Sequence, residues 1–377
     1  MKNIFSLLCT GLVGMLTACE TILPVDMPED ERWGITLNAV ASPDTTFKAY
    51  ITHCYPNNDA PEYAYPYYID NGYWEPDPVL HYLWSFIYKY YAEAPDPFNI
   101  EKNYNLIKKS TLSDADVELT VNGETNYPMR YDTLMLCFQS NYTPEIGDHL
   151  EVRINNAAGE QTVARTEIPR PQKLEIVNVK TECLEKEEYL REPTRGFNKG
   201  YVTMIIRLHE PGDEKNYYRL VVRGIEKTIG NNDYEYHKVW DVFQSSAPIF
   251  RDERLTTGWN TWPAYFSNVF DDTLINGESY EFEVKTYVLG HTDYFKDIWP
   301  TYEVSLQSIT EDYYRYLKSL QLYKISTLNT TFSEGVYIHS NNEGGWGLLG
   351  GISGEVHRVE PFKGMNESSE GNGSPTN

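Results

Sequence analysis

Hydrophobic and polar residues alternate with a period of two along most of this chain, as they do in half-buried β-strands. The first two such runs, residues 35–40 and 47–52, flank a Pro-Asp turn and predict a hairpin. A third run, residues 116–121, leads into an Asn-Gly dipeptide, which is typical of tight hairpin turns. Further strands are predicted at residues 133–138, 149–154, 161–168, 173–179, 201–208, 217–223, 234–242 and 280–288. The pattern therefore predicts a mainly β fold.

Two prolines divide this series of strands. Pro169 and Pro171 cannot continue a strand ladder, so they close a first module over residues 34–171. The later strands belong to a second module over residues 172–362. Short strands separated by polar turns are typical of sandwiches. We predict two antiparallel β-sandwich modules in tandem, Ig-like or transthyretin-like, followed by a disordered tail at 363–377.

Two segments show helical periodicity instead. An insert at residues 55–110 interrupts the first module, and within it residues 78–93 carry apolar side chains at helical spacing, with a proline in the first turn. The second segment begins at Ser308, which has the form of a capping box with Glu311. Its apolar positions are Tyr313, Tyr314, Tyr316, Leu317 and Leu320. We expect a helical, aromatic-rich insert in the first module and one short helix in the second.

The start of the chain has the form of a lipoprotein signal. Lys2 precedes an apolar run over residues 4–16, which is shorter than the roughly 20 residues needed to span a bilayer. The run ends in Leu-Thr-Ala-Cys, with the cysteine at position 19. We expect residues 1–18 to be a cleaved signal peptide, Cys19 to carry the lipid that holds the protein on the membrane, and residues 19–33 to be a tether. An ordinary signal peptide with an incidental cysteine is the alternative.

Net charge limits the classes of partner, and cysteine content limits the disulfides that can form. The formal net charge is -23, from 32 Lys plus Arg against 55 Asp plus Glu. That balance argues against nucleic-acid binding, which needs clustered positive charge, and against attraction to anionic lipid headgroups. Apart from Cys9 in the signal and Cys19, the cysteines are Cys54, Cys137 and Cys183. At most one disulfide can form among these three, and the sequence leaves its partners open.

The insert at residues 55–110 is also the predicted recognition element, because it holds 11 of the 31 tyrosines. Aromatic rings stack on sugars or peptides while their hydroxyl groups form hydrogen bonds. A glycan or peptide ligand would be bound by Tyr63, Tyr65, Tyr67, Tyr68, Tyr73 and Trp74. Core packing is the competing interpretation, since the helix at 78–93 could bury these rings. The sequence leaves both interpretations open.

The sequence contains one cofactor-like motif and no recognisable catalytic or metal motif. Residues 345–350 satisfy G-x-G-x-x-G, but a dinucleotide fingerprint needs a following helix and a later acidic residue. We therefore expect a glycine-rich bend that packs Trp346, Leu348 and Leu349 against the second module. The histidines show no zinc-binding spacing, and no nucleophile elbow occurs. We predict no cofactor, no metal and no catalytic residue.

Two kinds of site, a glycosidase site and a calcium site, need no recognisable sequence motif. A glycosidase needs only two carboxylates that the fold brings to about 5–10 Å. Asp271 and Asp272, with Asp114 and Asp116, could supply oxygen ligands to calcium, although a solvated turn fits better without the Gly and Glu positions of an EF-hand loop. A protein without enzymatic activity remains the prediction.

Several stretches of the chain occur in the order found in a known family. They are residues 115–119, 166–171, 210–211 running to 216–220, 313–317, and 340–341 running to 344–350. Together they resemble a Bacteroidota outer-membrane lipoprotein family known as a domain of unknown function, whose genes often lie beside those of TonB-dependent receptors. The resemblance spans roughly residues 37–361 and supplies no catalytic residues. It implies a lipid-anchored protein of the outer membrane, on its periplasmic face or at the cell surface.

The expected function follows from the resemblance and the export signal together. It is a binding lipoprotein accessory to a TonB-dependent nutrient transporter, with that receptor as partner and a glycan or peptide as ligand. The alternatives are a surface-structural or adhesive lipoprotein and, from a third class, a glycan-active hydrolase. The sequence specifies neither the ligand, nor the face of the outer membrane, nor the oligomeric state.

Overall fold

The structure, a computed structural model, describes residues 34–53, 108, 110–189, 192–212, 214–229, 235–241, 243–255, 266–293, 296–328 and 336–363. The chain divides into two units, Met1–Trp33 and Gly34–Asn377, and the description below concerns the second. The expected signal peptide (1–18), tether (19–33), insert helix (78–93) and tail beyond residue 363 lie outside the described residues.

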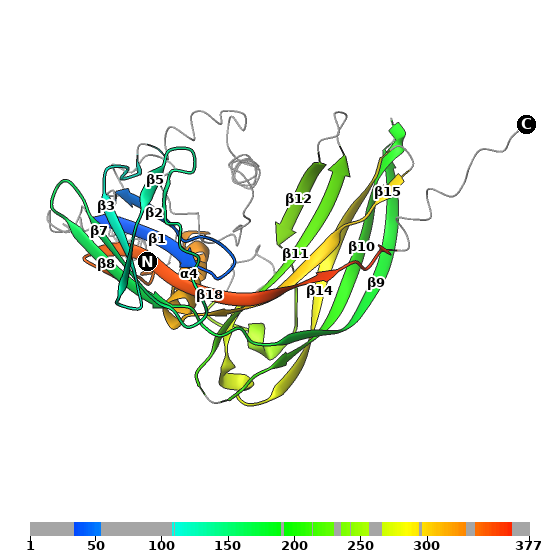
Figure 1. The fold of residues 1–377 in the computed structure, drawn as a ribbon. Coiled ribbons are helices and arrows are strands. Elements are labelled where there is room, and N and C mark those ends of the chain that lie inside the picture. The colour runs from blue at the N-terminus through cyan, green and yellow to red at the C-terminus, as the bar shows by residue number, and fades with distance from the viewer. Residues whose placement is uncertain are drawn as a thin grey trace, which may run out of the picture. The chain divides into compact units, whose positions relative to one another are not determined.

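Three β-sheets and one long helix make up the described part of this unit (Figure 1). The nine-stranded sheet has the order β12 (Glu235–Asp241), β11 (Tyr217–Ile229), β16 (Thr301–Ile309), β18 (Gly345–Val359), β1 (Ile35–Ala41), β2 (Lys48–His53), β6 (Cys137–Gln139) and β5 (Arg130–Asp132), with β13 (Val269–Asp271) paired to β11. The five-stranded sheet has the order β17 (Asn342–Glu343), β8 (Gln161–Glu167), β7 (His149–Asn155), β3 (Asp116–Val121) and β4 (Thr125–Pro128). The four-stranded sheet has the order β15 (Lys296–Ile298), β14 (Ser279–Asp293), β10 (Glu192–His209) and β9 (Leu174–Tyr189). The helix α4 spans Glu311–Leu328, and two short 3-10 helices are η2 (Pro248–Phe250) and η3 (Asp272–Leu274). The predicted mainly β fold is confirmed.

The first core lies between the β1–β2 part of the large sheet and the five-stranded sheet. Alternate side chains of β3 and β7 point into it, as Leu119 and Val152 show, and both are fully buried. They meet Leu37 of β1 and Ile51 of β2 in one apolar cluster. Burial of such side chains contributes roughly 1.5–3 kcal/mol each, so this alternation holds the two sheets together.

The predicted hairpins of this region are confirmed, with one correction. β1 pairs antiparallel with β2, and β3 with β4 through the Asn-Gly turn. Residues 133–138 were expected to form a single strand. The chain instead turns there, with Leu136 at a positive φ of 52°, and β5 pairs back on β6. The Asp132 carboxylate accepts hydrogen bonds from the backbone N–H groups of Leu134 and Met135, which stabilise the turn against the strand.

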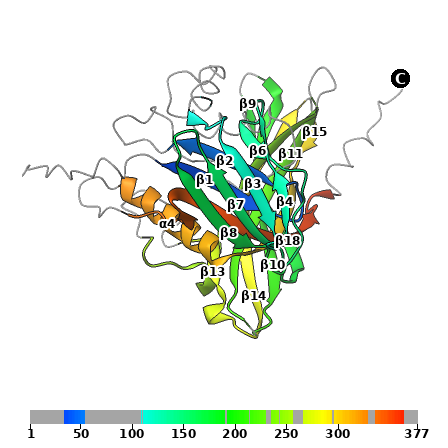
Figure 2. The same ribbon diagram turned by 60° about the vertical axis from the view of Figure 1, so that its left-hand side comes forward.

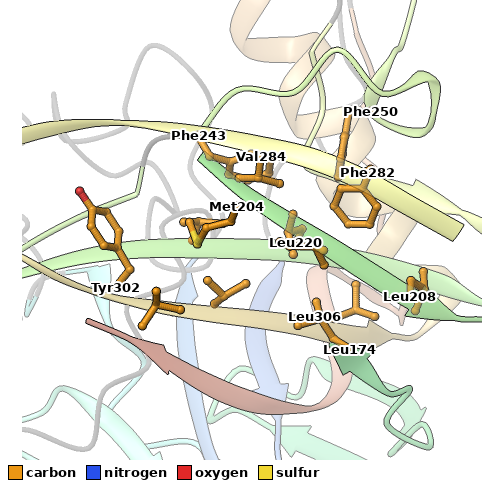
Figure 3. Packing of buried hydrophobic residues seen from close by; sticks show 14 of the residues in the cluster. Leu174, Met204, Leu208, Leu220, Phe243, Phe250, Phe282, Val284, Tyr302 and Leu306 are labelled. Atoms are coloured by element: carbon orange, nitrogen blue, oxygen red, sulfur yellow. The ribbon is translucent and has the colours of Figure 1, made fainter. Parts of the chain in front are cut away.

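The second core lies between β11 and β16 on one side and β9, β10 and β14 on the other. Figure 3 shows its side chains converging from both sheets, among them Met204 of β10, Leu220 of β11 and Leu306 of β16. Phe250 of η2 lies edge-on to Phe282 of β14, with ring centroids 5.3 Å apart. Strands β9, β10 and β14 run well beyond the predicted ranges. The second half is therefore also built from packed sheets.

The strand β18 belongs to both halves, and this is the main departure from the prediction. It runs parallel to β1 over Gly345–Gly351 and antiparallel to β16 over Ile352–Val359, so one sheet continues from the first core to the second (Figure 1). Two separate Ig-like sandwiches in tandem are not confirmed.

The expected glycine-rich bend is wrong, because the glycines serve close backbone packing within a strand. A Cβ at Gly347, whose φ is +98°, would lie 2.1 Å from the carbonyl oxygen of Leu37. Leu348 and Leu349 point to opposite faces and are both fully buried, while Trp346 is 40% exposed. The G-x-G-x-x-G residues thus lie within β18, which continues to Val359, and not at the junction of a strand with a helix that a dinucleotide site needs.

Helix α4 covers the other face of the large sheet beside β18 (Figure 2). The predicted apolar face is confirmed, since Tyr313, Tyr316 and Leu317 are buried against Leu348 of β18. The expected capping box at Ser308 is wrong. Ser308 is still in β16, and the helix starts at Glu311. The carbonyl of Thr310 accepts the first helical hydrogen bond, from the N–H of Tyr314 at 2.9 Å, so Thr310 is the N-cap.

Candidate functional site

A groove of about 780 Å³ lies between the five-stranded sheet and the start of α4. We call it the groove. It is lined by Glu118, Thr120, Gly123, Asn126, His149, Leu150, Glu151, Arg153, Arg165, Thr166, Glu167, Thr310, Glu311 and Asp312. The strand positions follow from the alternation described above, because the residues between the buried ones must face outward. Charged side chains on the outer face of the five-stranded sheet are thus gathered on one concave surface.

The charges in the groove form a chain of ion pairs. The Arg165 guanidinium lies 2.7 Å from both a Glu151 and a Glu343 carboxylate oxygen. Glu151 also receives a hydrogen bond of 2.9 Å from Arg153. The hydrogen bond and charge of Glu151, together with Glu343, raise the pKa of the exposed Arg165. Side chains of both signs of charge are therefore paired with one another on the outer face of this sheet.

The N-terminus of α4 closes one side of the groove. Glu311 and Asp312 lie in its first turn, where carboxylates interact favourably with the helix dipole. Asp312 is further fixed by the His339 ring, whose Nε2 lies 2.8 Å from Oδ1. These residues come from a part of the chain about 150 positions away from β7 and β8. They are brought here by β18, which pairs with β16 just before the helix, and by β17, which pairs with β8.

The candidate chemistry of the sequence can be placed only in part. Cys19 and the six aromatic residues Tyr63, Tyr65, Tyr67, Tyr68, Tyr73 and Trp74 lie outside the described residues. Within the described ranges, no group of three or more His, Cys, Asp or Glu is arranged to hold a metal ion. Cys137 is free and buried, and burial raises the pKa of its thiol to about 11.

The four aspartates considered for calcium do not act as one site. Asp272 is fully buried, and its carboxylate accepts hydrogen bonds from Lys215 at 2.6 Å and from the N–H of Asn216 at 2.7 Å. Asp271 caps the short helix η3 by accepting from the N–H of Thr273. Asp116 belongs to a different sheet, the five-stranded one. Asp271 and Asp272 pair with Lys215 inside the fold and do not form the solvated turn that we expected.

Sequence reasoning missed the groove as a site. The signal was present in part, because the outward positions of β7 and β8 alternate charged residues such as Glu151, Arg153 and Arg165. The contribution of α4 carried no such signal. Among the described residues, the helix α4 is too polar to cross a membrane, and no other helix is long and apolar enough to do so.

Comparison with known proteins gives a family match. The sequence model of a family described as "Domain of unknown function (DUF4249)" matches residues 84–358. No curated protein matches the chain. Among solved structures, one described as "Putative membrane anchored protein from Corynebacterium diphtheriae" matches at 10% identity and a TM-score of 0.17, covering 73% of this chain. The aligned region is 54% of that protein, so this chain spans about half the length of the structure that it matches.

Proposed function

This chain belongs to the family of the domain of unknown function DUF4249, whose name assigns no activity, and we propose its function from the residues of the chain itself. It is a lipid-anchored binding protein of the outer membrane, which assists a TonB-dependent nutrient transporter and catalyses no reaction. The groove is the observation that carries the binding role. The lipobox at residues 16–19 supports the anchor, and the resemblance of the motif order to lipoproteins encoded beside such receptors supports the partner.

The anchor limits where a partner can be. A segment such as residues 19–33 spans at most roughly 50 Å, at about 3.3–3.6 Å per residue. The folded unit that follows Trp33 therefore stays close to the membrane surface, where an outer-membrane transporter presents its loops and plug. Binding at this distance gains from a high effective concentration, so a modest affinity of the groove suffices.

The groove suits a partner surface that carries both signs of charge. Arg165 in the groove is exposed and pairs with the half-buried Glu151 and with the exposed Glu343 beside the groove. Such rim charges contribute little to stability but determine orientation and association rate. The docking we propose is consequently polar and sensitive to salt.

A charge reversal tests this docking with a matched control. Arg165→Glu places three carboxylates together in the groove and should lower recovery of the transporter from detergent-solubilised outer membranes about tenfold, equivalent to roughly 1.4 kcal/mol. Arg207→Glu is the control, because Arg207 bridges Glu175 and Glu281 in the same manner on the four-stranded sheet. Loss of recovery in both variants, or in neither, would contradict docking through the groove. Recovery of no transporter with the wild-type protein would reject the partner itself.

The anchor and the alternatives have their own measurements. Mass spectrometry of the mature N-terminus should find an acylated Cys19, and an unmodified or differently cleaved chain would reject the anchor. Polymerisation or host-cell binding would indicate the adhesive alternative, and product release from a glycan panel would indicate a hydrolase. Tyr67→Ala, Tyr73→Ala and Trp74→Ala, made singly, separate recognition from packing. If every variant lowers the melting temperature by several degrees and leaves ligand or partner affinity unchanged, these rings pack the core.

A further inference from the structure

A second, smaller cavity of about 110 Å³ lies on the α4 side of the large sheet, away from the groove. Strands β11, β16 and β18 form its floor, and the turn after β1 forms part of its rim. We call it the arginine pocket, defined by Arg219, Gln307, Ser353 and Tyr313. Its volume admits a group of a few heavy atoms and not a whole sugar or peptide.

Arg219 is a buried cation whose partners are incomplete. Its side chain is 5% exposed, and Nη1 donates a hydrogen bond of 3.3 Å to the hydroxyl of Tyr313. Its Nε is buried and has no hydrogen-bond partner among the described residues, which also offer it no ion pair. Buried charges are normally paired. An anion or another strong acceptor would complete this site.

Another buried cation, Lys318 of α4, has a full set of partners. The ammonium of Lys318 on α4 lies 3.0 Å from an Asp252 carboxylate oxygen and donates to the Ser267 hydroxyl at 3.0 Å. Lys318 is about as buried as Arg219. The contrast indicates that the missing acceptor at Arg219 is a property of the pocket and not of buried cations in this protein.

Two further polar groups share the pocket and also lack partners. Strand register places Arg219 opposite Gln307, and Gln307 opposite Gly354, which adds no side chain to this row. The Gln307 side-chain oxygen and the hydroxyl of Ser353 are buried without hydrogen bonds to described residues. Arg223 also lines the pocket but is not without a partner. The Arg219 guanidinium, the Ser353 hydroxyl and the Gln307 side-chain oxygen therefore converge on the same small space with hydrogen-bonding capacity left over.

We propose that the arginine pocket binds the carboxylate of a small organic acid. The carboxylate would accept from the Arg219 guanidinium, which matches carboxylate geometry, and from the Ser353 hydroxyl. The remainder of the ligand would leave past the turn after β1, whose Asp44 is exposed and hydrogen-bonded to Ser42. Asp44 and Glu303 line the same pocket together with Arg219 and Arg223. Because these formal charges cancel, the lining favours a singly charged carboxylate over a more highly charged anion such as phosphate. This site goes beyond the proposed transporter role and stands independently of it.

Thermal unfolding of the full-length lipoprotein in detergent tests the proposal. The probes are acetate, propionate, succinate and glycylglycine, each compared with its uncharged amide and with chloride at equal ionic strength. A ligand that binds only the folded state raises the melting temperature. At least one carboxylate should raise it saturably while its amide does not, and inorganic phosphate should have no effect.

Three variants decide whether the effect belongs to this pocket. Arg219→Met should weaken the response at least tenfold without lowering the melting temperature of the free protein, since a buried unpaired charge is removed. Ser353→Ala should weaken the response several-fold and serves also if Arg219→Met fails to fold. Arg207→Met, on the four-stranded sheet and outside both cavities, should respond as the wild type does.

The following outcomes would reject the carboxylate site. No response to any carboxylate, or an equal response to carboxylate and amide, rejects the site. A response to phosphate alone rejects the ligand class. If Ser353→Ala and every folded Arg219→Met sample respond like the wild type, the pocket is a hydrated cavity and Arg219 serves structure only.

Discussion

The position at which β18 leaves β1 and joins β16 should tolerate no side chain. A Cβ added to Gly351 would lie 1.8 Å from the carbonyl oxygen of Glu167 in β8, whereas ordinary contacts begin at 3.4 Å. One strand must therefore move by roughly 1.6 Å, because the obstacle is backbone and cannot rotate away. Gly351 also exchanges two hydrogen bonds with Thr310, of 3.1 and 3.3 Å, which such a shift would break.

The expected cost of Gly351→Ala follows from these two effects. Overpacking costs typically about 1–3 kcal/mol, and a clash with backbone falls at the upper end of that range. Each broken hydrogen bond adds roughly 1 kcal/mol. We expect a loss of about 3–5 kcal/mol in the free energy of unfolding. At about 2 °C per kcal/mol for a large unit, the melting temperature should fall by roughly 6–10 °C.

Gly34→Ala is the matched control for this experiment. A Cβ at Gly34 would lie 3.7 Å from the Trp346 ring, which is an ordinary contact. Its melting temperature, measured by circular dichroism, should stay within about 1 °C of the wild type. If Gly351→Ala also melts within about 2 °C of the wild type, β18 and β8 are not in fixed contact and the shared-strand architecture is wrong.

Three further results are expected from buried groups. Lys318→Met removes one of the two cations at the Asp252 carboxylate and should destabilise by about 2–3 kcal/mol in urea unfolding, less than a fully broken buried pair because Arg254 remains. Burial would raise the pKa of Asp252, but the hydrogen bonds from Arg254 and Lys318 outweigh it and hold that pKa well below its usual range. The ionised Asp252 therefore stabilises the fold fully above about pH 5, and this stabilisation is lost as the pH falls through 4 and below. Asp252→Asn should reduce the loss of unfolding free energy between pH 5 and acid pH, and an unchanged pH dependence would refute the low pKa of Asp252. Burial raises the pKa of the Cys137 thiol to about 11, so a thiol reagent at pH 8 should modify it only after unfolding, and rapid labelling of the native protein at Cys137 would contradict the structure.

Local sequence patterns could predict part of the groove but not the arginine pocket. The exposed charges of β7 and β8 follow from alternation, so the sheet face of the groove was within reach of the sequence. Arg219 was not, because a strand pattern predicts an arginine to be outward and solvated. Its burial depends on α4 and the turn after β1 covering that face of the sheet, and its lack of a partner depends on which side chains arrive with them.

The sequence by itself determined most strand positions, the polar turns and the buried face of α4, because the periods of strands and helices depend on neighbours a few residues apart. Tertiary structure alone decided that residue 345 pairs with residue 35 and that one sheet continues through both cores. Local periodicity carries no information about partners some 300 positions apart. Glycines also have low intrinsic strand preference, so the start of β18 is a strand because it pairs with β1 and β16, and several of its glycines lie where a neighbouring backbone leaves no room for a side chain.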